Sequence, residues 1–197
     1  AYTDPSVKES FKIIADLSAK GYLLKNAASL SWQEAVTPLV EGKAAMYLIG
    51  QFIMDVIPAD KKANIDFFAF PMIKQSTYSV DTPTDGFMMP KNAKNKEAGK
   101  KFLAFLAGKE AQGRFCGALG RLAANVNVAV PNPEAQRGLD MVKGAALATQ
   151  FYDRDAPEEM AAKGMNAIVD IWASPTKMDD ILANLDKERV RIYADLK

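Results

Sequence analysis

Residues 42–50 read Gly-Lys-Ala-Ala-Met-Tyr-Leu-Ile-Gly, an apolar run enclosed by two glycines. A short apolar run bounded in this way predicts a strand that is buried on both faces, as the strands of parallel sheets are. The run leads directly into Gln51, and we expect a short helix from Gln51 to Ile57. A strand followed at once by a helix indicates an α/β protein.

Two further strands are expected along the chain. Residues 65–70 and residues 86–89 are rich in apolar side chains, and each segment is stopped by a proline. Residues 74–85 form a polar loop between them. Residues 121–130 are expected to be extended, because valines alternate there with Asn and Ala. Residues 151–155 are interpreted as a dense polar and aromatic loop.

Helical patterns surround these strands. Apolar residues recur at helical spacing behind capping residues, and glycine or proline ends most of the patterns. The expected helices run from Asp4-Pro5 to Gly21, Ser31 to Gly42, Asn95 to Gly108, Glu110 to Ala118, Asn132 to Ala148, Pro157 to Ser174 and Met178 to Leu196. The sequence predicts a helix-rich α/β fold with a small central sheet flanked by helices. So few strands suggest one lobe whose other elements are supplied from elsewhere.

The composition is that of a soluble globular protein of 197 residues, 49% hydrophobic and 25% charged. Lys and Arg number 25 against 24 Asp and Glu, so the net charge of +1 gives no general attraction to nucleic acid or anionic membranes. Lys91 to Lys101 holds five lysines and one glutamate. We interpret this segment as a solvated helix start, because no aromatic residues are interleaved with the lysines.

No catalytic centre, metal site or cofactor site is predicted. The chain has no histidine, which removes His-based acid–base catalysis and most familiar zinc and haem sites. Cys116 is the one cysteine, and we expect it to be buried and inert rather than a nucleophile. The two carboxylates of each adjacent acidic pair in the helices point in different directions, so they do not suit acid–base catalysis together. The sequence therefore favours a binding protein over an enzyme.

Polar and aromatic residues follow the first predicted strand directly. In open α/β sheets, ligands bind beyond the carboxyl ends of the strands. Gly50 permits close backbone approach, Gln51 offers an amide donor and acceptor, and Phe52 offers a flat apolar face. This combination suits a carbohydrate, which presents both hydroxyls and apolar C–H patches. Phe52 could equally be a core residue.

Two further groups are candidates for the same site. Thr84, Asp85 and Gly86 precede the third predicted strand, and Asp153 and Arg154 form a charged donor and acceptor pair. Each group also has a structural interpretation. Asp85 could be a turn residue ahead of the glycine, and Arg154 could pair with neighbouring acidic residues at the surface.

The order of several segments resembles the bacterial extracellular solute-binding proteins of family 1, the maltose-binding-protein-like substrate receptors of sugar ABC importers. Together the segments cover most of the chain, and the first two resemble the family's signature of a "GkaAM" run followed by glycine and an aromatic residue. The matching segments are GKAAM (42–46), GQF (50–52), DFFAFP (66–71), DGFMMPKNA (85–93), AGKKFLAFL (98–106), GRLAA (120–124) and QFYDRD (150–155). The last segment is similar to the α-glucoside-binding branch.

This resemblance implies a periplasmic-binding-protein type II fold, in which two lobes close around the solute. Residues 1–197 would be the C-terminal lobe, with the N-terminal lobe and a signal peptide outside this chain. Phe52 stands where many members place a sugar-stacking aromatic residue, and Asp85 and Gly86 match a loop that faces ligand hydroxyls. Arg154 lies where related binders reach the sugar, and Arg121 lies near the hinge.

The resemblance also implies partners and a location. The expected partners are a carbohydrate ligand and the membrane subunits of an ABC permease, and no nucleic acid. The expected location is the periplasm, or the cell surface as a lipoprotein in a Gram-positive organism. An isolated lobe would expose apolar area and a sheet edge, so self-association is expected.

Three alternatives stay open at this point. The same fold could bind a polyamine or, through Arg121 or Arg154, an organic anion, whereas iron is disfavoured because histidine is absent. The chain could instead be a standalone protein-interaction domain. An enzyme would have to use Cys116 as its nucleophile.

Overall fold

The computed structural model describes residues 1–72 and 77–194. By its internal contacts the chain divides into two units, one made of Ala1–Leu39 and Phe151–Lys197, the other of Val40–Gln150. The short helix α2 (Val36–Val40) crosses from the first unit into the second. The first is the terminal unit and the second is the central unit.

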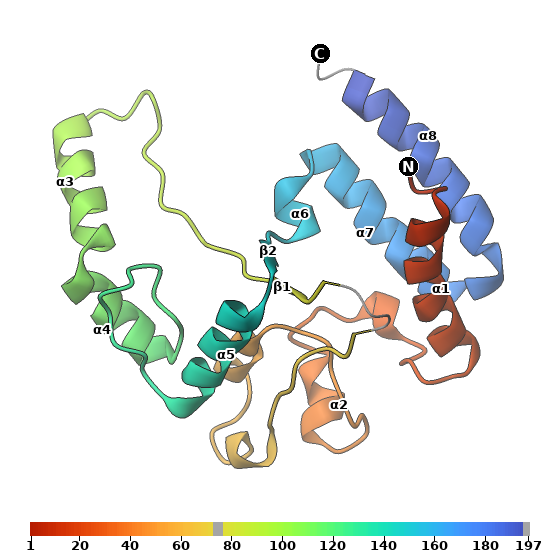
Figure 1. Ribbon diagram of the computed structural model, residues 1–197, viewed down its shortest axis with the longest axis horizontal. Coiled ribbons are helices and arrows are strands. Elements are labelled where there is room, and N and C mark those ends of the chain that lie inside the picture. Colours follow the sequence, from red (N-terminus) through yellow and green to blue (C-terminus); the bar gives the residue numbers. More distant parts are fainter. Residues whose placement is uncertain (73–76, 195–197) are drawn as a thin grey trace. The chain divides into compact units, whose positions relative to one another are not determined.

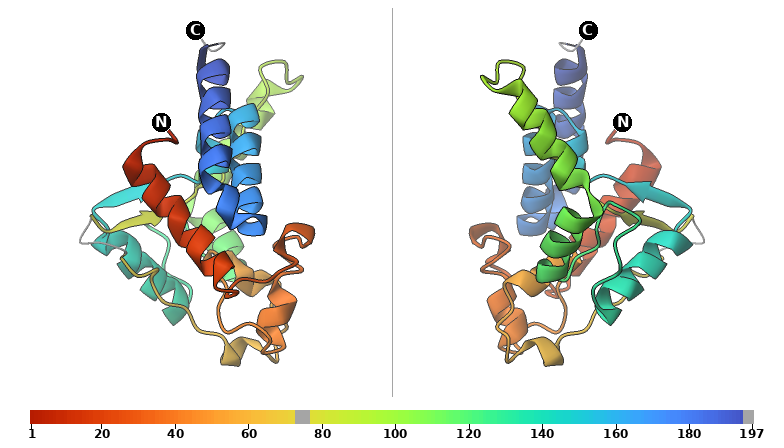
Figure 2. Two further views of the ribbon diagram at one scale, coloured as in Figure 1. Left: turned by 90° about the vertical axis from the view of Figure 1, so that its right-hand side faces the viewer. Right: turned by 90° about the vertical axis from the view of Figure 1, so that its left-hand side faces the viewer.

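The terminal unit is built from helices (Figures 1 and 2). Three long helices, α1, α7 and α8, pack together, and α7 and α8 make the most extensive contact. Its elements are α1 (Pro5–Ala19), η1 (Ala27–Ser29), α6 (Tyr152–Asp155), α7 (Glu158–Ala173), η4 (Pro175–Lys177) and α8 (Met178–Ala194). Their packing encloses the hydrophobic core, in which Met160, Ile171 and Leu182 are fully buried.

Local sequence signals set the ends of these helices. The carboxylate of Asp4 accepts a hydrogen bond from the Ser6 backbone N–H at 2.9 Å, which caps α1 ahead of Pro5. Gly21 follows α1 with a φ of 72°, a left-handed conformation that favours glycine. Pro175 separates α7 from α8.

The predicted helices Asp4-Pro5 to Gly21, Pro157 to Ser174 and Met178 to Leu196 are confirmed apart from their exact ends, and residues 195 and 196 lie outside the described part. The predicted helix from Ser31 to Gly42 is an α-helix only over Val36–Val40 and begins with a turn. Residues 152–155 form the single turn α6 rather than a loop.

Within its described residues, the central unit contains three helices, two short 3₁₀ turns and a two-stranded sheet. Its elements are η2 (Gln51–Asp55), η3 (Lys62–Asn64), β1 (Ser79–Asp81), α3 (Lys96–Ala107), α4 (Lys109–Leu119), α5 (Pro133–Gly144) and β2 (Leu147–Thr149). The strands are parallel, with Val80 opposite Ala148. Asn95 and Asn132 cap α3 and α5 through their side-chain oxygens, as the sequence predicts.

The predicted strands at residues 44–49, 65–70 and 86–89 are wrong. None of the three segments pairs with a neighbouring strand within the described residues. Met46 and Leu48 are 70% and 76% exposed, so the first run is not buried on both faces. An apolar run indicates a segment that suits burial, but a strand also needs a partner, and the partner is not encoded locally.

The sheet forms in segments that the sequence analysis assigns differently. β1 lies in the predicted polar loop 74–85, whose first residues fall outside the described part. β2 follows α5, which ends at Gly144 rather than at Ala148. Residues 121–130 contain turns instead of a regular extended segment, because the Asn125 side-chain oxygen accepts a hydrogen bond from the Asn127 N–H at 3.0 Å.

The helix-rich α/β class with a small parallel sheet is nevertheless the class that the sequence predicts. Within the part of the chain that the structure describes, no helix is both long and apolar enough to cross a membrane.

Candidate ligand-binding site

The first predicted site segment lies at the start of η2. Gly50 precedes this turn in an extended conformation, with φ −75° and ψ 164°. The ring of Phe52 folds back over Gly50, so that a Cβ placed on Gly50 would lie 2.7 Å from Cε1 of the ring. A glycine is therefore required at this position for the ring to lie where it does. Phe52 itself is half-buried, which leaves part of its surface available to a ligand.

The amide of Gln51 connects η2 with α5. Its Nε2 donates a hydrogen bond to the backbone oxygen of Glu134 at 3.1 Å. Its Oε1 lies close to Gly138, where a Cβ would be only 2.5 Å away. These contacts fix the orientation of the side chain. Gln51 is exposed all the same, so the outer part of the amide can face a ligand.

An ion pair brings Arg121 to the same turn. The guanidinium of Arg121, which follows α4, contacts the carboxylate of Asp55 at the end of η2. The Nε atom of Arg121 is buried and has no hydrogen-bond partner among the described residues. Arg121 therefore lies next to η2, although it is 66 positions from Asp55 in sequence. Asp55 could not be identified from the sequence, since an exposed aspartate in a short turn carries no signal of its own.

A second ion pair lies on the neighbouring face of α5. Arg137 contacts Asp66 at 2.5 Å, and its guanidinium carbon lies 4.5 Å from the centroid of the Phe67 ring. The hydrogen bond from Arg137 lowers the pKa of the Asp66 carboxyl, so this group stays ionised. The surroundings of η2 and α5 are thus rich in charged and planar polar groups. Sequence reasoning missed this pair because its members are 71 positions apart.

Thr84, Asp85 and Gly86 lie in the exposed segment that leaves β1. The two parallel strands end side by side, since the Thr82 backbone N–H donates to the Thr149 carbonyl oxygen at 2.9 Å. The hydroxyl of Thr149 also contacts the carboxylate of Asp81. The predicted segment therefore follows the carboxyl end of a parallel strand, which is where α/β folds bind ligands.

Asp153 and Arg154 belong to the terminal unit, on α6, and both are exposed. The guanidinium carbon of Arg154 lies 5.6 Å from the centroid of the Phe151 ring. Tyr152 anchors this turn: its hydroxyl lies 2.6 Å from that of Tyr2 and donates to the Met160 carbonyl oxygen at 3.2 Å.

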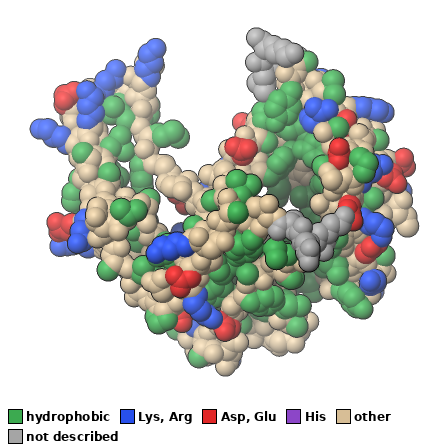
Figure 3. Space-filling view, viewed as in Figure 1, with side chains coloured by type: hydrophobic (Ala, Val, Ile, Leu, Met, Phe, Trp, Pro, Cys, Tyr) green, Lys and Arg blue, Asp and Glu red, His purple; other side chains and the backbone are tan. Residues whose placement is uncertain are grey.

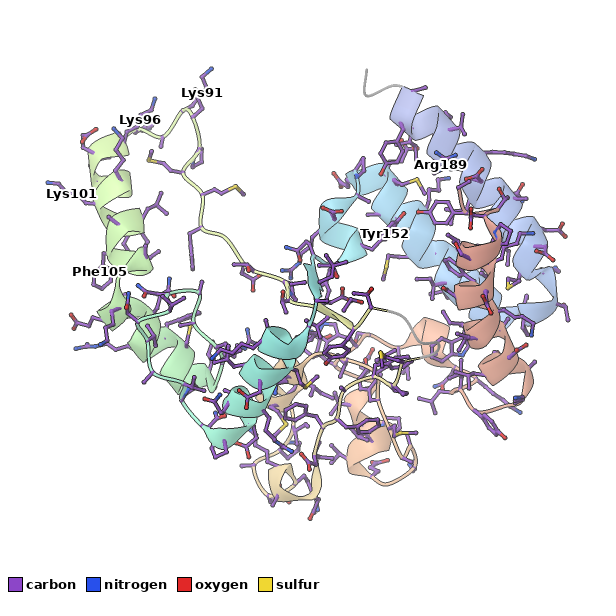
Figure 4. The ribbon with its side chains drawn as sticks, in the orientation of Figure 1. Lys91, Lys96, Lys101, Phe105, Tyr152 and Arg189 are labelled. Atoms are coloured by element: carbon purple, nitrogen blue, oxygen red, sulfur yellow. The ribbon has the colours of Figure 1, made fainter. Side chains whose placement is uncertain are left out.

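The Tyr152 ring packs directly on α7, beside which Figure 4 shows it. A Cβ on Gly164 would lie 2.5 Å from its Cε1. Burial, followed by the hydrogen bond with Tyr2, raises the pKa of Tyr152 well above its usual range. Tyr152 is thus a neutral structural anchor that leaves Asp153 and Arg154 at the surface.

Two surface hollows lie away from the predicted residues. One of about 350 Å³ lies between α4 and residues 128–131, and one of about 310 Å³ is lined by Tyr2, Arg189 and Tyr193. Within the described residues, no three His, Cys, Asp or Glu side chains gather as a metal site would require. Burial raises the pKa of Cys116, which disfavours the reactive thiolate. The arrangement is suited to non-covalent binding.

Comparison with known protein sequences finds relatives of one kind, the extracellular binding proteins. The sequence profile of the bacterial extracellular solute-binding proteins matches residues 2–113. An uncharacterised ABC transporter extracellular-binding protein of Pyrococcus horikoshii is 32% identical over 113 residues, which are 57% of this chain and 24% of that protein.

A solved structure matches almost the whole chain. The bacterial solute receptor AcbH, described as having an exclusive substrate preference for β-D-galactopyranose, superposes with a TM-score of 0.88 at 27% identity. The match covers 98% of this chain and 51% of AcbH, so the chain spans about half of that receptor's length. The profile, the relative and the fold agree, and the chain belongs to the family of bacterial extracellular solute-binding proteins.

Proposed function

We propose that this chain is part of the solute-binding component of an ABC importer, and that its solute is a sugar. The observation that carries the proposal is the match of 98% of the chain to AcbH, a receptor described as preferring β-D-galactopyranose. The family profile and the relative from Pyrococcus horikoshii, which is named as an ABC transporter extracellular-binding protein, support the transport role.

The surroundings of η2 provide the chemistry that a sugar needs. The half-buried Phe52 ring can stack on the C–H face of a pyranose, and the exposed Gln51 amide can hydrogen-bond its hydroxyls. The ion pair of Asp55 and Arg121 offers charged acceptors and donors beside them, which make the stronger hydrogen bonds. Asp85, in the segment that follows β1 of the same unit, is a further proposed contact.

The proposed mechanism is capture without covalent chemistry. Residues 1–197 would form the C-terminal lobe of a two-lobe receptor, and the lobes would close around the sugar. The closed form would then dock on the membrane permease and release its solute there. The family of extracellular binding proteins supports a location in the periplasm or at the cell surface.

Isothermal titration of the full receptor that carries these residues tests the proposal. The ligands are galactose, glucose, maltose, trehalose and sucrose, with spermidine and citrate as non-sugar controls. We expect saturable binding of at least one sugar and of neither control. Binding of spermidine or citrate without any sugar would overturn the sugar assignment while leaving the receptor role in place. Failure of every ligand would contradict the proposal.

Variants of η2 sharpen the test. Phe52→Ala should weaken sugar binding about tenfold or more, since it removes the stacking face. Phe68→Ala, which truncates an exposed phenylalanine of the same unit, is the matched control and should bind normally. Gly50→Ala should act like Phe52→Ala because the new methyl group displaces the ring. Gly144→Ala, which meets no atom within 4 Å, is its control.

A further inference from the structure

The lysine segment, residues 91–101, leads into α3 and forms the first half of that helix. It holds five lysines and one acidic residue, Glu97. Every one of its lysines is exposed: Lys91, Lys94, Lys96, Lys100 and Lys101. Glu97 pairs with Lys100 at 2.9 Å. The segment therefore presents a strong positive charge to the solvent.

The lysine segment differs in charge from the rest of the molecule. It carries five lysines against one glutamate, a net charge of +4, whereas 20 Lys and Arg stand against 23 Asp and Glu outside it, a net charge of −3. The overall charge of +1 is therefore the sum of a positive segment and a slightly negative remainder. A charge that is concentrated in this way attracts an anionic surface locally, even where the whole molecule does not.

Helix stability does not account for these lysines. Cationic side chains stabilise a helix near its C-terminus and acidic ones near its N-terminus, whereas Lys96 is the first residue of α3. Within the described residues, the lysines of the segment other than Lys100 form no ion pair. In α1, by contrast, Lys12 pairs with Asp16 one turn further along at 2.5 Å. The charge of the lysine segment is thus available to an anion from outside the described chain.

The lysine segment spreads its charges over a broad surface. Figure 3 shows basic side chains gathered over α3 and the segment before it. In Figure 4 the labelled side chains of Lys91, Lys96 and Lys101 extend away from the ribbon. The hollows beside α4 and beside Tyr193 are lined by other residues. This arrangement suits an extended anionic surface better than a small anion held in a pocket.

We propose that the lysine segment binds the anionic phospholipid headgroups of a membrane surface. The choice of a membrane rests on the proposed function, since the binding component of an ABC importer works beside the membrane that holds the permease. Clusters of about four to eight basic residues are typical of binding to anionic lipids. The basic residues of the segment are all lysines, whose compact ammonium groups on flexible stems can follow mobile headgroups, whereas arginine suits carboxylates in a fixed geometry.

An acidic protein is a less suitable partner for the lysine segment. The centres of protein–protein interfaces are depleted of charged residues, and of lysine in particular. A lipid surface makes no such demand, since its attraction for basic side chains acts through a layer of solvent. Nucleic acid is disfavoured as well, because no aromatic residue is interleaved with the lysines for bases to stack on.

Co-sedimentation of residues 1–197 with lipid vesicles tests the proposal. One set of vesicles is phosphatidylcholine alone, and the other contains about one third phosphatidylglycerol, an anionic lipid. We expect binding to the second set to be at least about tenfold tighter than to the first. A rise from about 50 mM to about 500 mM NaCl should abolish this difference, because salt screens exposed charges. Inorganic phosphate should compete no better than chloride at the same ionic strength.

Two triple variants with the same change in charge locate the binding. The first removes three charges of the lysine segment and keeps the Asn95 cap: Lys91→Gln, Lys94→Gln and Lys96→Gln. The matched control removes three exposed lysines elsewhere in the central unit: Lys61→Gln, Lys62→Gln and Lys143→Gln. The first variant should bind the anionic vesicles at least about 20-fold more weakly than the unmodified chain, since each lysine near such a surface contributes about fivefold. The control should bind within about threefold of the unmodified chain.

Each other outcome overturns the proposal. Equal weakening of both triple variants would assign the attraction to the net charge alone. Equal binding to both sets of vesicles, or to neither, would reject a role for anionic lipid. Binding of polyglutamate without binding of vesicles would assign the lysine segment to an acidic protein. Release by inorganic phosphate, but not by chloride at the same ionic strength, would make the segment a site for a soluble anion.

Sugar titration of the full receptor separates this proposal from the proposed function. Sugar binding without vesicle binding rejects the membrane contact alone, and vesicle binding without sugar binding rejects the proposed function alone. The triple variant of the lysine segment should bind sugar as the unmodified receptor does, because none of its three lysines is a proposed sugar contact.

Discussion

The helix pairs α7–α8 and α3–α4 are both amphipathic, yet they differ in what their apolar faces meet. The first pair, with α1, encloses Met160, Ile171 and Leu182, which are fully buried. The second pair has no buried residue. The difference shows that a helical pattern specifies which face is suited to burial, whereas it does not specify the element that covers that face.

The largest contrast is expected from core truncation. Leu182→Ala should lower the free energy of unfolding by about 2–5 kcal/mol, because it leaves a cavity between packed helices. Phe105→Ala, at a larger but exposed side chain, should change the stability of residues 1–197 by less than about 1 kcal/mol. Urea unfolding followed by circular dichroism measures both. A similar loss for both variants would show that α3 is already covered.

The ends of the elements differ in how far they could be predicted. Each helix cap is local, because the side chain of Asp4, Asn95 or Asn132 accepts a hydrogen bond from a backbone N–H two or three residues further along. The sequence alone therefore identifies the helices that they cap. Strands β1 and β2 pair across 68 positions, from Ser79 to Leu147. No local sequence pattern in either strand indicates which segment it pairs with. The three wrong strand predictions have the same cause.

The candidate site stays a prediction, and only its contiguous part can be selected from the sequence alone. Gly50, Gln51 and Phe52 are contiguous, so a glycine and an aromatic residue after an apolar run were enough to select them. The pairing of Arg121 with Asp55 spans 66 positions, and it depends on how the chain returns after α4. Such contacts arise from tertiary structure and leave no trace in residue spacing.

Glycine substitutions provide the next contrast. Gly164→Ala should destabilise the terminal unit by about 1–3 kcal/mol, because its methyl group would collide with the Tyr152 ring. Gly117→Ala on α4 meets no atom within 4 Å and should instead gain about 0.5–1 kcal/mol from helix propensity. Both tryptophans, Trp32 and Trp172, lie in the terminal unit, so fluorescence follows the unfolding of Gly164→Ala. Gly117 lies in the central unit, so circular dichroism follows Gly117→Ala. Stabilisation by both variants would contradict the packing of Tyr152 on α7.

The smallest expected contrast is the response to acid. Asp186 accepts hydrogen bonds at 2.8 Å from Arg189 and from the Tyr2 N–H, and these, the Arg189 bond first, lower its pKa. A carboxyl with a lowered folded pKa contributes stability above its unfolded pKa and loses it as the pH falls through the folded value. Stability should therefore fall below about pH 4. Asp186→Asn should lose less between pH 5 and pH 3 than the unmodified chain. Equal losses would contradict the role of Asp186.

Hydrogen exchange of residues 1–197, read by mass spectrometry, tests most directly whether α3 and α4 lack their cover. Amides of α7 and α8 should exchange only through global unfolding, because these helices enclose the core. Amides of α3 and α4 should exchange at least about 100-fold faster, because these helices have no buried residue. Equal protection of both pairs in residues 1–197 would contradict the account.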